Sequence, residues 1–411
     1  MLRVVVVGGG AAGFFGAIAC ARKLQDLAIN HGQITLLEAG VSPLAKVKIS
    51  GGGRCNVTHS CFDPKILVTH YPRGGRELRS AFARFQPQDT LAWFNQEGVS
   101  LKTEPDGRIF PVSDRSQTII DCLCQAATQA GVELRCASPV KQVVKNDGVF
   151  TITLANGQTL AADHLLLATG SSKDGYRLAQ NLGHQIVAPV PSLFTLKLSD
   201  PQLHQLAGIS VAIAKVQYGK YHQTGAILIT HWGISGPAML KLSAWAARDL
   251  AANNYRGHLH INWLPAHNQI SDRLAITKIE HGKKKLVNYR PFEQIPQRLW
   301  QFLIDRAQIN PQLNWADLSH KQLNALTEQL QKGIYPFAGR GIYKEEFVTC
   351  GGVSLKEVDF KTMASRVCKG LYLAGEILDL DGVTGGFNFQ SAWTTGYLAG
   401  EAIATTNHVL P

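Results

Sequence analysis

The chain has 411 residues, of which 45% are hydrophobic and 17% charged, and its formal net charge is +11. This length predicts more than one hydrophobic core, and the composition excludes a largely disordered chain. The apolar runs are too short to span a membrane, and eight cysteines in so long a chain predict neither a disulfide framework nor a metal site. Because an apolar run begins at Val4, we expect no signal peptide and a cytoplasmic protein.

The first 38 residues have the pattern of a dinucleotide-binding βαβ unit. Val4–Val7 predicts a buried parallel strand, and a helix rich in small residues follows the next turn. That turn contains the expected cofactor-binding residues Gly8, Gly10, Ala11, Ala12 and Gly13. Gly8 is expected to make the tight turn, Gly10 to let the backbone reach a pyrophosphate, and Gly13 to let the helix pack on the strand. A second strand is predicted at Ile34–Leu37, and Glu38 at its end is placed to bind ribose hydroxyls. This acid favours FAD or NAD over NADP, whose 2′-phosphate it would repel.

A second glycine cluster, Ser50-Gly51-Gly52-Gly53, follows one connection later and leads into Arg54, Cys55 and Asn56. Three consecutive glycines let backbone amides approach a ligand closely, with polar and reactive side chains beside them. The stretch therefore predicts a flavin site with the reactive groups nearby.

Two later segments favour FAD over NAD. Leu165–Gly170 predicts a buried strand that ends in a tight turn, and Leu371–Glu376 predicts another that ends in glycine and an acid suited to ribitol hydroxyls. Gly385–Asn388 is predicted to open a last helix, whose N-terminus would stabilise the anionic reduced flavin. No second Gly-x-Gly-x-x-Gly turn follows a strand, so NADH or NADPH is expected only as a transient electron donor.

The positive charge is concentrated in two segments. Between Lys46 and Arg84 there are eight basic residues against two acidic ones, and between Lys278 and Arg298 there are six against two. Two interpretations are open: solvated surfaces with some flavin phosphate contacts, or a surface that binds a polyanion such as RNA.

The motifs together resemble one family, the BaiN/RdsA-type (YhiN-like) FAD-dependent oxidoreductases. The resemblance rests mainly on Ser50–Thr58, on Thr230-His-Trp-Gly-Ile-Ser-Gly-Pro237 and on the block from Gly375-Glu376 to Gly386-Phe-Asn388. It implies an α/β fold in three parts. A split Rossmann-type FAD-binding domain (1–190 and 343–411) would carry an inserted β-rich domain (191–270) and a small helical domain (271–342).

The resemblance also implies a reaction, the reduction of an activated C=C bond. One branch of the family reduces bile-acid enones, and another makes dihydrouridine in large-subunit ribosomal RNA. The basic segments favour ribosomal RNA or its precursor as the partner. The alternatives are a reductase of a small-molecule enone and a non-catalytic, flavin-bound factor that binds RNA or senses redox state. The oligomeric state is not predicted.

Three residues are candidates for catalysis. Cys55 is the first candidate for proton donor, because a thiol near Arg54 can exchange protons near neutral pH; alternatively, it packs beside the isoalloxazine. His231 is the second, expected at a strand-to-helix turn with Ser235 near the cap. It is expected to bond a substrate carbonyl or to serve as the acid; alternatively, it is a structural histidine bonded to backbone. Arg54 is expected to hold the flavin or a substrate carbonyl.

The residues expected to contact FAD come from several distant segments. Phe387 stands where relatives usually have tyrosine, so no role of that hydroxyl carries over. The expected contacts are Gly8, Gly10, Ala11, Ala12, Gly13, Glu38, Ala39, Lys46, Ser50, Gly51, Gly52, Gly53, Arg54, Cys55, Asn56, Val140, Ala168, Thr169, Gly170, Gly375, Glu376, Gly386, Phe387 and Asn388.

Overall fold

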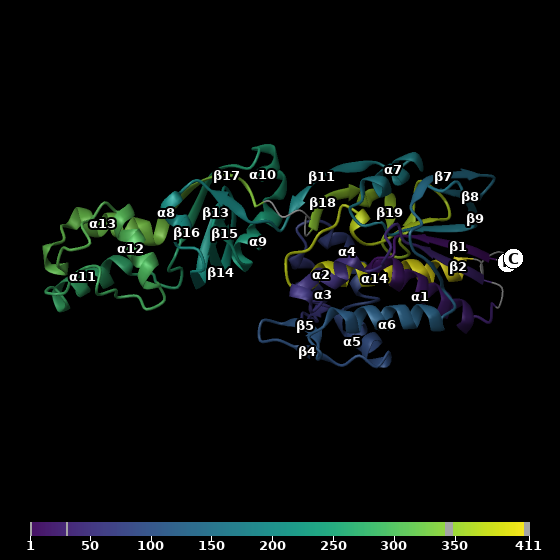
Figure 1. Cartoon of the computed structure of the whole chain (residues 1–411), viewed down its shortest axis with the longest axis horizontal. Coiled ribbons are helices and arrows are strands. Elements are labelled where there is room, and N and C mark those ends of the chain that lie inside the picture. Colours follow the sequence, from purple (N-terminus) through teal and green to yellow (C-terminus); the bar gives the residue numbers. More distant parts are fainter. Residues whose placement is uncertain (1, 30–31, 342–347, 407–411) are drawn as a thin grey trace. The chain divides into compact units, whose positions relative to one another are not determined.

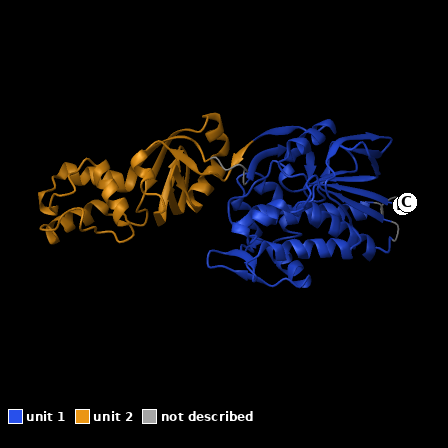
Figure 2. Ribbon diagram, in the orientation of Figure 1, with its two compact units in different colours: residues 1–189, 348–411 blue, residues 190–347 orange. Residues whose placement is uncertain are grey.

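The computed structural model describes residues 2–29, 32–341 and 348–406. The chain divides into two compact units (Figure 2). Unit 1 comprises Met1–Pro189 and Val348–Pro411, and unit 2 comprises Val190–Phe347. Unit 1 is thus built from both ends of the chain.

A seven-stranded sheet forms the centre of unit 1, in the order β19-β20-β21-β10-β1-β2-β6. Its parallel strands are β21 (Leu371–Leu373), β10 (His164–Leu167), β1 (Leu2–Val7), β2 (Gly32–Leu37) and β6 (Glu133–Arg135). Two short antiparallel strands, β20 (Ala364–Ser365) and β19 (Val358–Asp359), complete one edge. The β-branched run Val4–Val7 is buried, as a central strand covered on both faces requires.

The register brings the carboxyl ends of the central strands level with one another. Val7 pairs with Leu37 on one side and with Leu167 on the other, and Leu167 pairs with Leu373. The residues that follow these strands therefore gather at one edge of the sheet, where ligands of doubly wound folds bind.

Helices α1 (Ala11–Asp26) and α14 (Phe387–Thr406) pack together so closely that their backbones touch (Figure 1). A Cβ added to Gly396 would lie 2.4 Å from the Ala12 carbonyl oxygen, and one added to Gly400 would lie 2.3 Å from that of Gly16. Both contacts advance by four residues in the same direction, so the helices run parallel. Because α14 starts nine residues before Gly396 and α1 one residue before Ala12, α14 reaches about 12 Å further out.

The remaining elements of unit 1 are short helices and two small antiparallel sheets. The helices are α2 (Ala45–Gly53), α3 (Pro64–Leu67), η1 (Val68–His70), α4 (Gly75–Phe82), α5 (Pro87–Gln96), α6 (Ser116–Gln129), α7 (Lys173–Asn181), η3 (Leu355–Glu357) and η4 (Gly375–Ile377). The sheets are β3 (Thr58–His59), β5 (Arg108–Pro111) and β4 (Leu101–Thr103), and β7 (Val140–Asn146), β8 (Val149–Leu154) and β9 (Thr159–Ala162). Where the chain passes between the units, β11 (Ile186–Ser192) pairs with β18 (Val348–Val353).

Unit 2 contains a closed six-stranded barrel and a group of helices. The barrel strands are β12 (Leu196–Leu198), β15 (Gly233–Ser235), β14 (Tyr221–Thr230), β13 (Ser210–Tyr218), β16 (Arg256–Asn262) and β17 (Gly333–Arg340). The helices are α8 (Pro201–His204), α9 (Pro237–Trp245), α10 (Ala247–Ala252), α11 (Ile270–Glu280), α12 (Gln297–Arg306), η2 (Trp315–Asp317) and α13 (His320–Lys332). No helix in the described ranges of either unit has the length and apolarity needed to cross a membrane.

The division of unit 2 differs from the two inserted domains expected at 191–270 and 271–342. One hydrophobic core extends from the barrel into the helices, and the amide of buried Trp263, directly after β16, donates a hydrogen bond of 2.8 Å to the Leu330 carbonyl of α13. Helices that share a core with the barrel are not a separate compact unit. The expected boundary at 342/343 lies outside the described residues, and the other expected boundary lies one residue from the observed one.

The contact between α1 and α14 predicts that Gly396 tolerates no side chain. The substitution Gly396→Val would place methyl groups against the α1 backbone and lower the free energy of unfolding by about 3 kcal/mol. Urea titration followed by circular dichroism measures this change. Thr405→Val, at an exposed position of the same helix, is the matched control. Equal stability of the two variants would show that the helices are not in backbone contact.

Candidate functional site

The turn after β1 packs tightly against backbone at two of its glycines and leaves open space at the N-terminus of α1. A Cβ on Gly8 would lie 2.3 Å from the Ala168 carbonyl oxygen, and one on Gly13 would lie 1.9 Å from that of Gly8. Around Gly10, by contrast, an added Cβ would meet nothing within 4 Å. The N-terminus of α1 therefore has room for an anionic group over its unpaired amides, as a pyrophosphate requires.

Glu38, at the end of β2, is held against this turn. Its Oε2 accepts a hydrogen bond of 2.8 Å from the Gly9 amide, and its Oε1 accepts one of 2.7 Å from the Gly40 amide. Each oxygen keeps a lone pair with which to accept a ribose hydroxyl. Ala39 is exposed beside it, and buried Val140 begins β7 nearby, because the Ser138 amide donates to the Glu38 carbonyl.

The ends of β10 and β21 bring a second group of expected residues to the same edge. Glu376 forms an ion pair with Lys46, and its Oε1 accepts a hydrogen bond of 3.0 Å from the Thr349 amide. Lys46 also donates to Ser171, at 3.3 Å, in the turn after Ala168–Gly170. The Thr169 hydroxyl points toward α7, since a Cβ on Gly175 would lie 1.8 Å from it. We therefore expect the backbone of Thr169, rather than its side chain, to face a cofactor.

The glycine cluster interrupts α2 and forms an open, left-handed stretch of backbone. Gly51, Gly52 and Gly53 have φ angles of 57°, 71° and 84°, values that glycine adopts without strain. A Cβ on Gly52 or Gly53 would meet nothing within 4 Å, so this stretch leaves space for a ligand. Cys55 also has a positive φ, 62°, which costs a non-glycine residue about 1–2 kcal/mol.

Cys55 is fully buried, and its environment differs from the one expected. Burial raises the pKa of its thiol from 9.0 to about 12, although a hydrogen bond with Ser50 acts in the opposite direction. Arg54, which was expected to promote proton exchange near neutral pH, instead forms ion pairs with carboxylates. The raised pKa does not support that expectation, and a catalytic Cys55 would act as a thiol that stays protonated.

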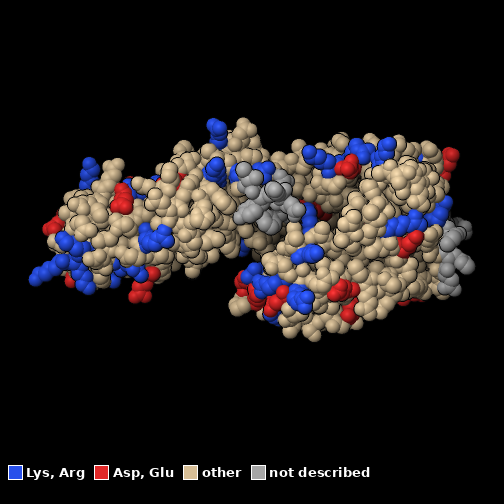
Figure 3. Space-filling view, in the orientation of Figure 1, with Lys and Arg blue, Asp and Glu red and all other residues tan. Residues whose placement is uncertain are grey.

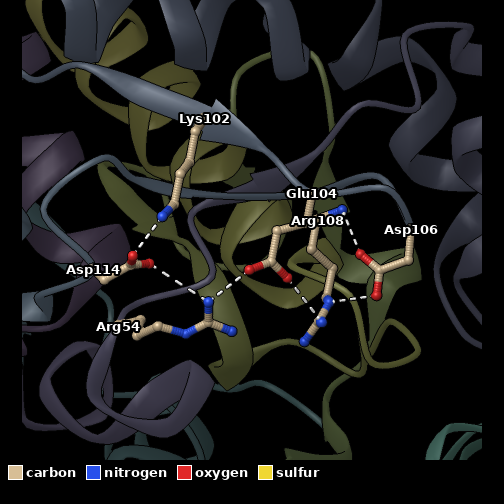
Figure 4. Close-up of polar contacts among 6 residues, drawn as sticks. All are labelled: Arg54, Lys102, Glu104, Asp106, Arg108 and Asp114. Carbon is tan, nitrogen blue, oxygen red and sulfur yellow. Dashed lines mark hydrogen bonds and ion pairs between the residues drawn. The ribbon is translucent and has the colours of Figure 1, made fainter.

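Arg54 belongs to a charged network that joins the glycine cluster to the β4–β5 hairpin (Figure 4). Its Nη1 lies 2.6 Å from Glu104 Oε1 and 3.5 Å from Asp114 Oδ1, and its guanidinium carbon lies 4.0 Å from the centre of the Phe110 ring. Glu104 also pairs with Arg108, at 3.0 Å, and Asp114 with Lys102. A substrate or flavin carbonyl would share Arg54 with these partners.

Asn56 ties the glycine cluster to the start of α14. With its amide nitrogen facing the Thr58 carbonyl (3.0 Å), its amide oxygen accepts from the Gly386 amide (2.9 Å). A Cβ on Gly386 would lie 2.5 Å from the Thr58 carbonyl oxygen, so the two segments are in backbone contact. Asn388 holds the preceding loop through two hydrogen bonds with Gly382.

Buried Phe387 stacks with two half-buried histidines, an arrangement that sequence reasoning missed. Its ring centre is 4.2 Å from that of His70 and 4.7 Å from that of His59, and its carbonyl accepts a hydrogen bond of 2.7 Å from Tyr71. His59 directly follows Thr58, so extending the motif by one residue would have found it. No periodic or spacing signal points to His70.

His231 lies in unit 2 and is not at a strand-to-helix turn. It forms, with Trp232, the tip of the hairpin between β14 and β15, because Thr230 pairs directly with Gly233. Helix α9 begins only at Pro237, after Gly236 at its cap, so Ser235 ends a strand instead. His231 is exposed, and no hydrogen bond of its side chain is found within the described part of the chain. Its catalytic role stays a prediction.

The geometry at Glu38 predicts a loss of FAD affinity in the Glu38→Ala variant. Removing an acceptor of charge-assisted hydrogen bonds, each worth about 1.5–3 kcal/mol, should raise the Kd for FAD at least about tenfold. Fluorescence titration of the apoprotein with FAD measures the Kd. Asp174→Ala, at an exposed position of α7, serves as control. An unchanged Kd for Glu38→Ala would contradict a ribose contact.

The raised pKa of Cys55 predicts how stability depends on alkaline pH. A thiol whose pKa is higher in the folded state stabilises the fold fully below its unfolded pKa, and this contribution is lost as pH rises from 9.0 toward about 12. The Cys55→Ala variant should therefore lose less stability than the wild type over this range. Alanine keeps the Cβ and its backbone strain, and Cys20 and Cys122, with pKa values also raised to about 12, titrate in both proteins. Parallel curves from urea titrations at several pH values would argue against the buried thiol.

Comparison with known proteins agrees with the fold and the motifs. The family model described as HI0933-like protein Rossmann domain matches residues 2–402. The ribosomal RNA dihydrouridine synthase of Escherichia coli is 30% identical over 412 residues, covering 96% of each chain. The 3-dehydro-bile acid delta(4,6)-reductase of Clostridium scindens is 29% identical over 420 residues, covering 98% of this chain and 99% of that protein.

A solved structure, the 3-ketosteroid-delta4-(5alpha)-dehydrogenase from Rhodococcus jostii RHA1, is similar with a TM-score of 0.53. The identity is 15%, with 98% of this chain and 97% of that chain covered, so this similarity concerns the fold alone. The expected Rossmann-type fold is confirmed. The chain belongs to the HI0933-like Rossmann family of FAD-dependent oxidoreductases, as its motifs predicted.

Proposed function

We propose that this chain is an FAD-dependent reductase that converts uridine to dihydrouridine in large-subunit ribosomal RNA. The full-length similarity to a ribosomal RNA dihydrouridine synthase supports the proposal. So does a sheet edge whose residues fit FAD. An enzyme with this substrate would work in the cytoplasm, the compartment expected from the sequence.

Different parts of FAD would lie at the N-termini of the two packed helices, α1 and α14. The N-terminus of α1 would bind the pyrophosphate, with Glu38 on the adenosine ribose. Glu376 and Lys46, already paired, would meet the ribitol and neighbouring groups. Because α14 reaches further out than α1, its N-terminus would lie at the isoalloxazine rather than at the phosphates.

When bound, FAD supplies the two electrons for the reduction, and we propose NADH or NADPH as their transient source. The protein must then hold the uracil carbonyl and deliver a proton to the carbon beside it. Arg54 is the proposed partner of the carbonyl, since its side chain is 32% exposed and carries donors in addition to Nη1. Cys55 is the proposed proton donor, because a thiol with a raised pKa keeps its proton at neutral pH.

The observation that favours RNA over a small enone is the set of cations without acidic partners. Between Lys278 and Arg298, none of the six basic side chains lies within ion-pair distance of a carboxylate in the described ranges. Three of them, Lys278, Arg290 and Arg298, bond only to neutral oxygens. Figure 3 shows Lys and Arg side chains gathered over the helical part of unit 2. A neutral enone has no use for such cations, whereas RNA phosphates do.

A second candidate, reduction of a small-molecule enone, is favoured by the equally extensive similarity to the bile acid reductase. Ionic strength separates the two substrates, because RNA binding weakens steeply with salt and enone binding does not. The third possibility is a flavin-bound factor without turnover, which would pass no electrons from NADH or NADPH onward to another molecule. Anaerobic mixing of the FAD-loaded protein with either donor tests that case.

The proposed function predicts the loss of one modified nucleotide when the protein is absent. Ribosomal RNA from a deletion strain should lack a uridine that is 2 Da heavier than normal, since reduction adds two hydrogens. Mass spectrometry of RNA fragments detects this loss. A plasmid with the wild-type chain should restore the nucleotide, while Cys55→Ala, with normal FAD content, should restore much less. An unchanged dihydrouridine content in the deletion strain would refute the RNA substrate.

A further inference from the structure

Unit 1 contains a surface groove that no sequence motif predicted. It has a volume of about 570 Å³ and lies between α4 and the segment 355–366. The two walls are almost 300 residues apart in sequence, so the groove exists only in the folded chain. Its polar lining consists of Arg76, Glu77, Ser80, Lys356, Asp359, Lys361 and Arg366.

The groove carries more positive than negative charge, and most of its cations are unpaired. Four basic side chains face two acidic ones. Arg76, Lys356 and Lys361 are exposed, and in the portion of the chain that the structure describes no carboxylate lies within ion-pair distance of them. Arg366 is 3.7 Å from Asp359, with 58% of its side chain exposed. Arg84 adds a fifth cation at the same wall, because it donates a hydrogen bond to the Lys361 carbonyl.

Both walls of the groove are attached to the loop that leads into α14. Arg73, two residues before α4, forms an ion pair with Asp381, whose side chain is fully buried. A Cβ on Gly74 would lie 2.3 Å from the Leu380 side chain and 3.3 Å from that of Leu355. The groove is therefore fixed to the segment between Glu376 and Gly386, on the same unit as the residues expected to hold FAD.

We propose that this groove binds the phosphate backbone of the RNA substrate and positions it on the flavin-binding unit. Arginine and lysine side chains free of carboxylate partners suit phosphate oxygens. The one aromatic residue of the lining, Phe360, is buried, so bases have no exposed ring in the groove on which to stack. The groove thus recognises backbone rather than sequence. This inference rests on the proposed function, since it assumes an RNA substrate.

The test compares two triple variants of the FAD-loaded protein. In the groove variant, Arg76→Gln, Lys356→Gln and Lys361→Gln remove three positive charges. In the control variant, Lys141→Gln, Lys173→Gln and Lys220→Gln remove three exposed charges elsewhere. The probe is a fluorescein-labelled 20-nucleotide single-stranded RNA, and fluorescence anisotropy gives its Kd at several salt concentrations.

The groove variant should bind this RNA less tightly and with a weaker dependence on salt. Loss of three phosphate contacts reduces the slope of log Kd against log salt by about 2 to 3, which makes binding about 100-fold weaker at about 0.1 M salt. The control variant should bind like the wild type. Equal affinities and slopes for wild type and groove variant would overturn the proposal, and so would an equal loss in both variants, which would indicate only net charge.

Two further measurements separate this inference from its alternatives. If the groove variant binds RNA normally but its FAD is reduced more slowly by NADPH, the groove serves the dinucleotide instead, and the proposal is wrong. Dihydrouridine in ribosomal RNA, measured in the deletion strain carrying each variant, tests the proposed function separately. A wild-type chain that restores no dihydrouridine refutes that function, while the anisotropy data still decide whether the groove binds RNA.

Discussion

The backbone contact between α1 and α14 is the constraint on which the site depends. Gly396 and Gly400 allow α14 to lie against the carbonyls of Ala12 and Gly16 at a distance that any side chain would prevent. The contact fixes both the direction and the offset of the two helices. As a result, the N-termini of the two helices, which both carry a partial positive charge, lie at different places. That of α1 lies at the turn after β1, and that of α14 lies at the loop that carries Asn56.

A second set of contacts joins this helix pair to the glycine cluster. Asn56 bridges Thr58 and Gly386, and Tyr71 donates to the carbonyl of Phe387. Cys55 has an unfavourable backbone conformation for a non-glycine residue, and such strain persists only where surrounding structure holds it. Here the Cys55 amide donates a hydrogen bond to the Ser50 carbonyl, and the next residue, Asn56, is held by its hydrogen bonds with Thr58 and Gly386. The strained backbone at Cys55 is thus held in place by contacts between segments more than 300 residues apart.

Sequence reasoning predicted the parts of the site that local pattern determines. The first βαβ unit, with Glu38 at the end of β2, follows from glycine spacing and apolar runs, and so does the start of α14 near Gly386. Sequence reasoning failed where long-range contacts determine the environment of a residue. No pattern near Arg54 in the sequence indicates that Glu104 and Asp114 are its partners, and these carboxylates pair with the cation that was expected to act on Cys55.

The same limit explains two other differences. The helices of unit 2 look like a separate domain in sequence, but Trp263 and its neighbours join them to the barrel core. His231 precedes a helix in sequence, yet the short strand Gly233–Ser235 stands between them and makes a hairpin. A three-residue strand is too short for periodicity to reveal, and its existence depends on the barrel strands that it joins.

The split of unit 1 has a consequence for the order in which the chain matures. Unit 2 is continuous in sequence and has its own core, so it can fold while the ribosome is still adding residues, as domains generally do. Unit 1 cannot complete its fold until β21 and α14 have been synthesised. Until then the apolar face of α1 that α14 covers stays exposed to water. The nascent chain is therefore most exposed to aggregation after unit 2 has folded and before α14 has been synthesised.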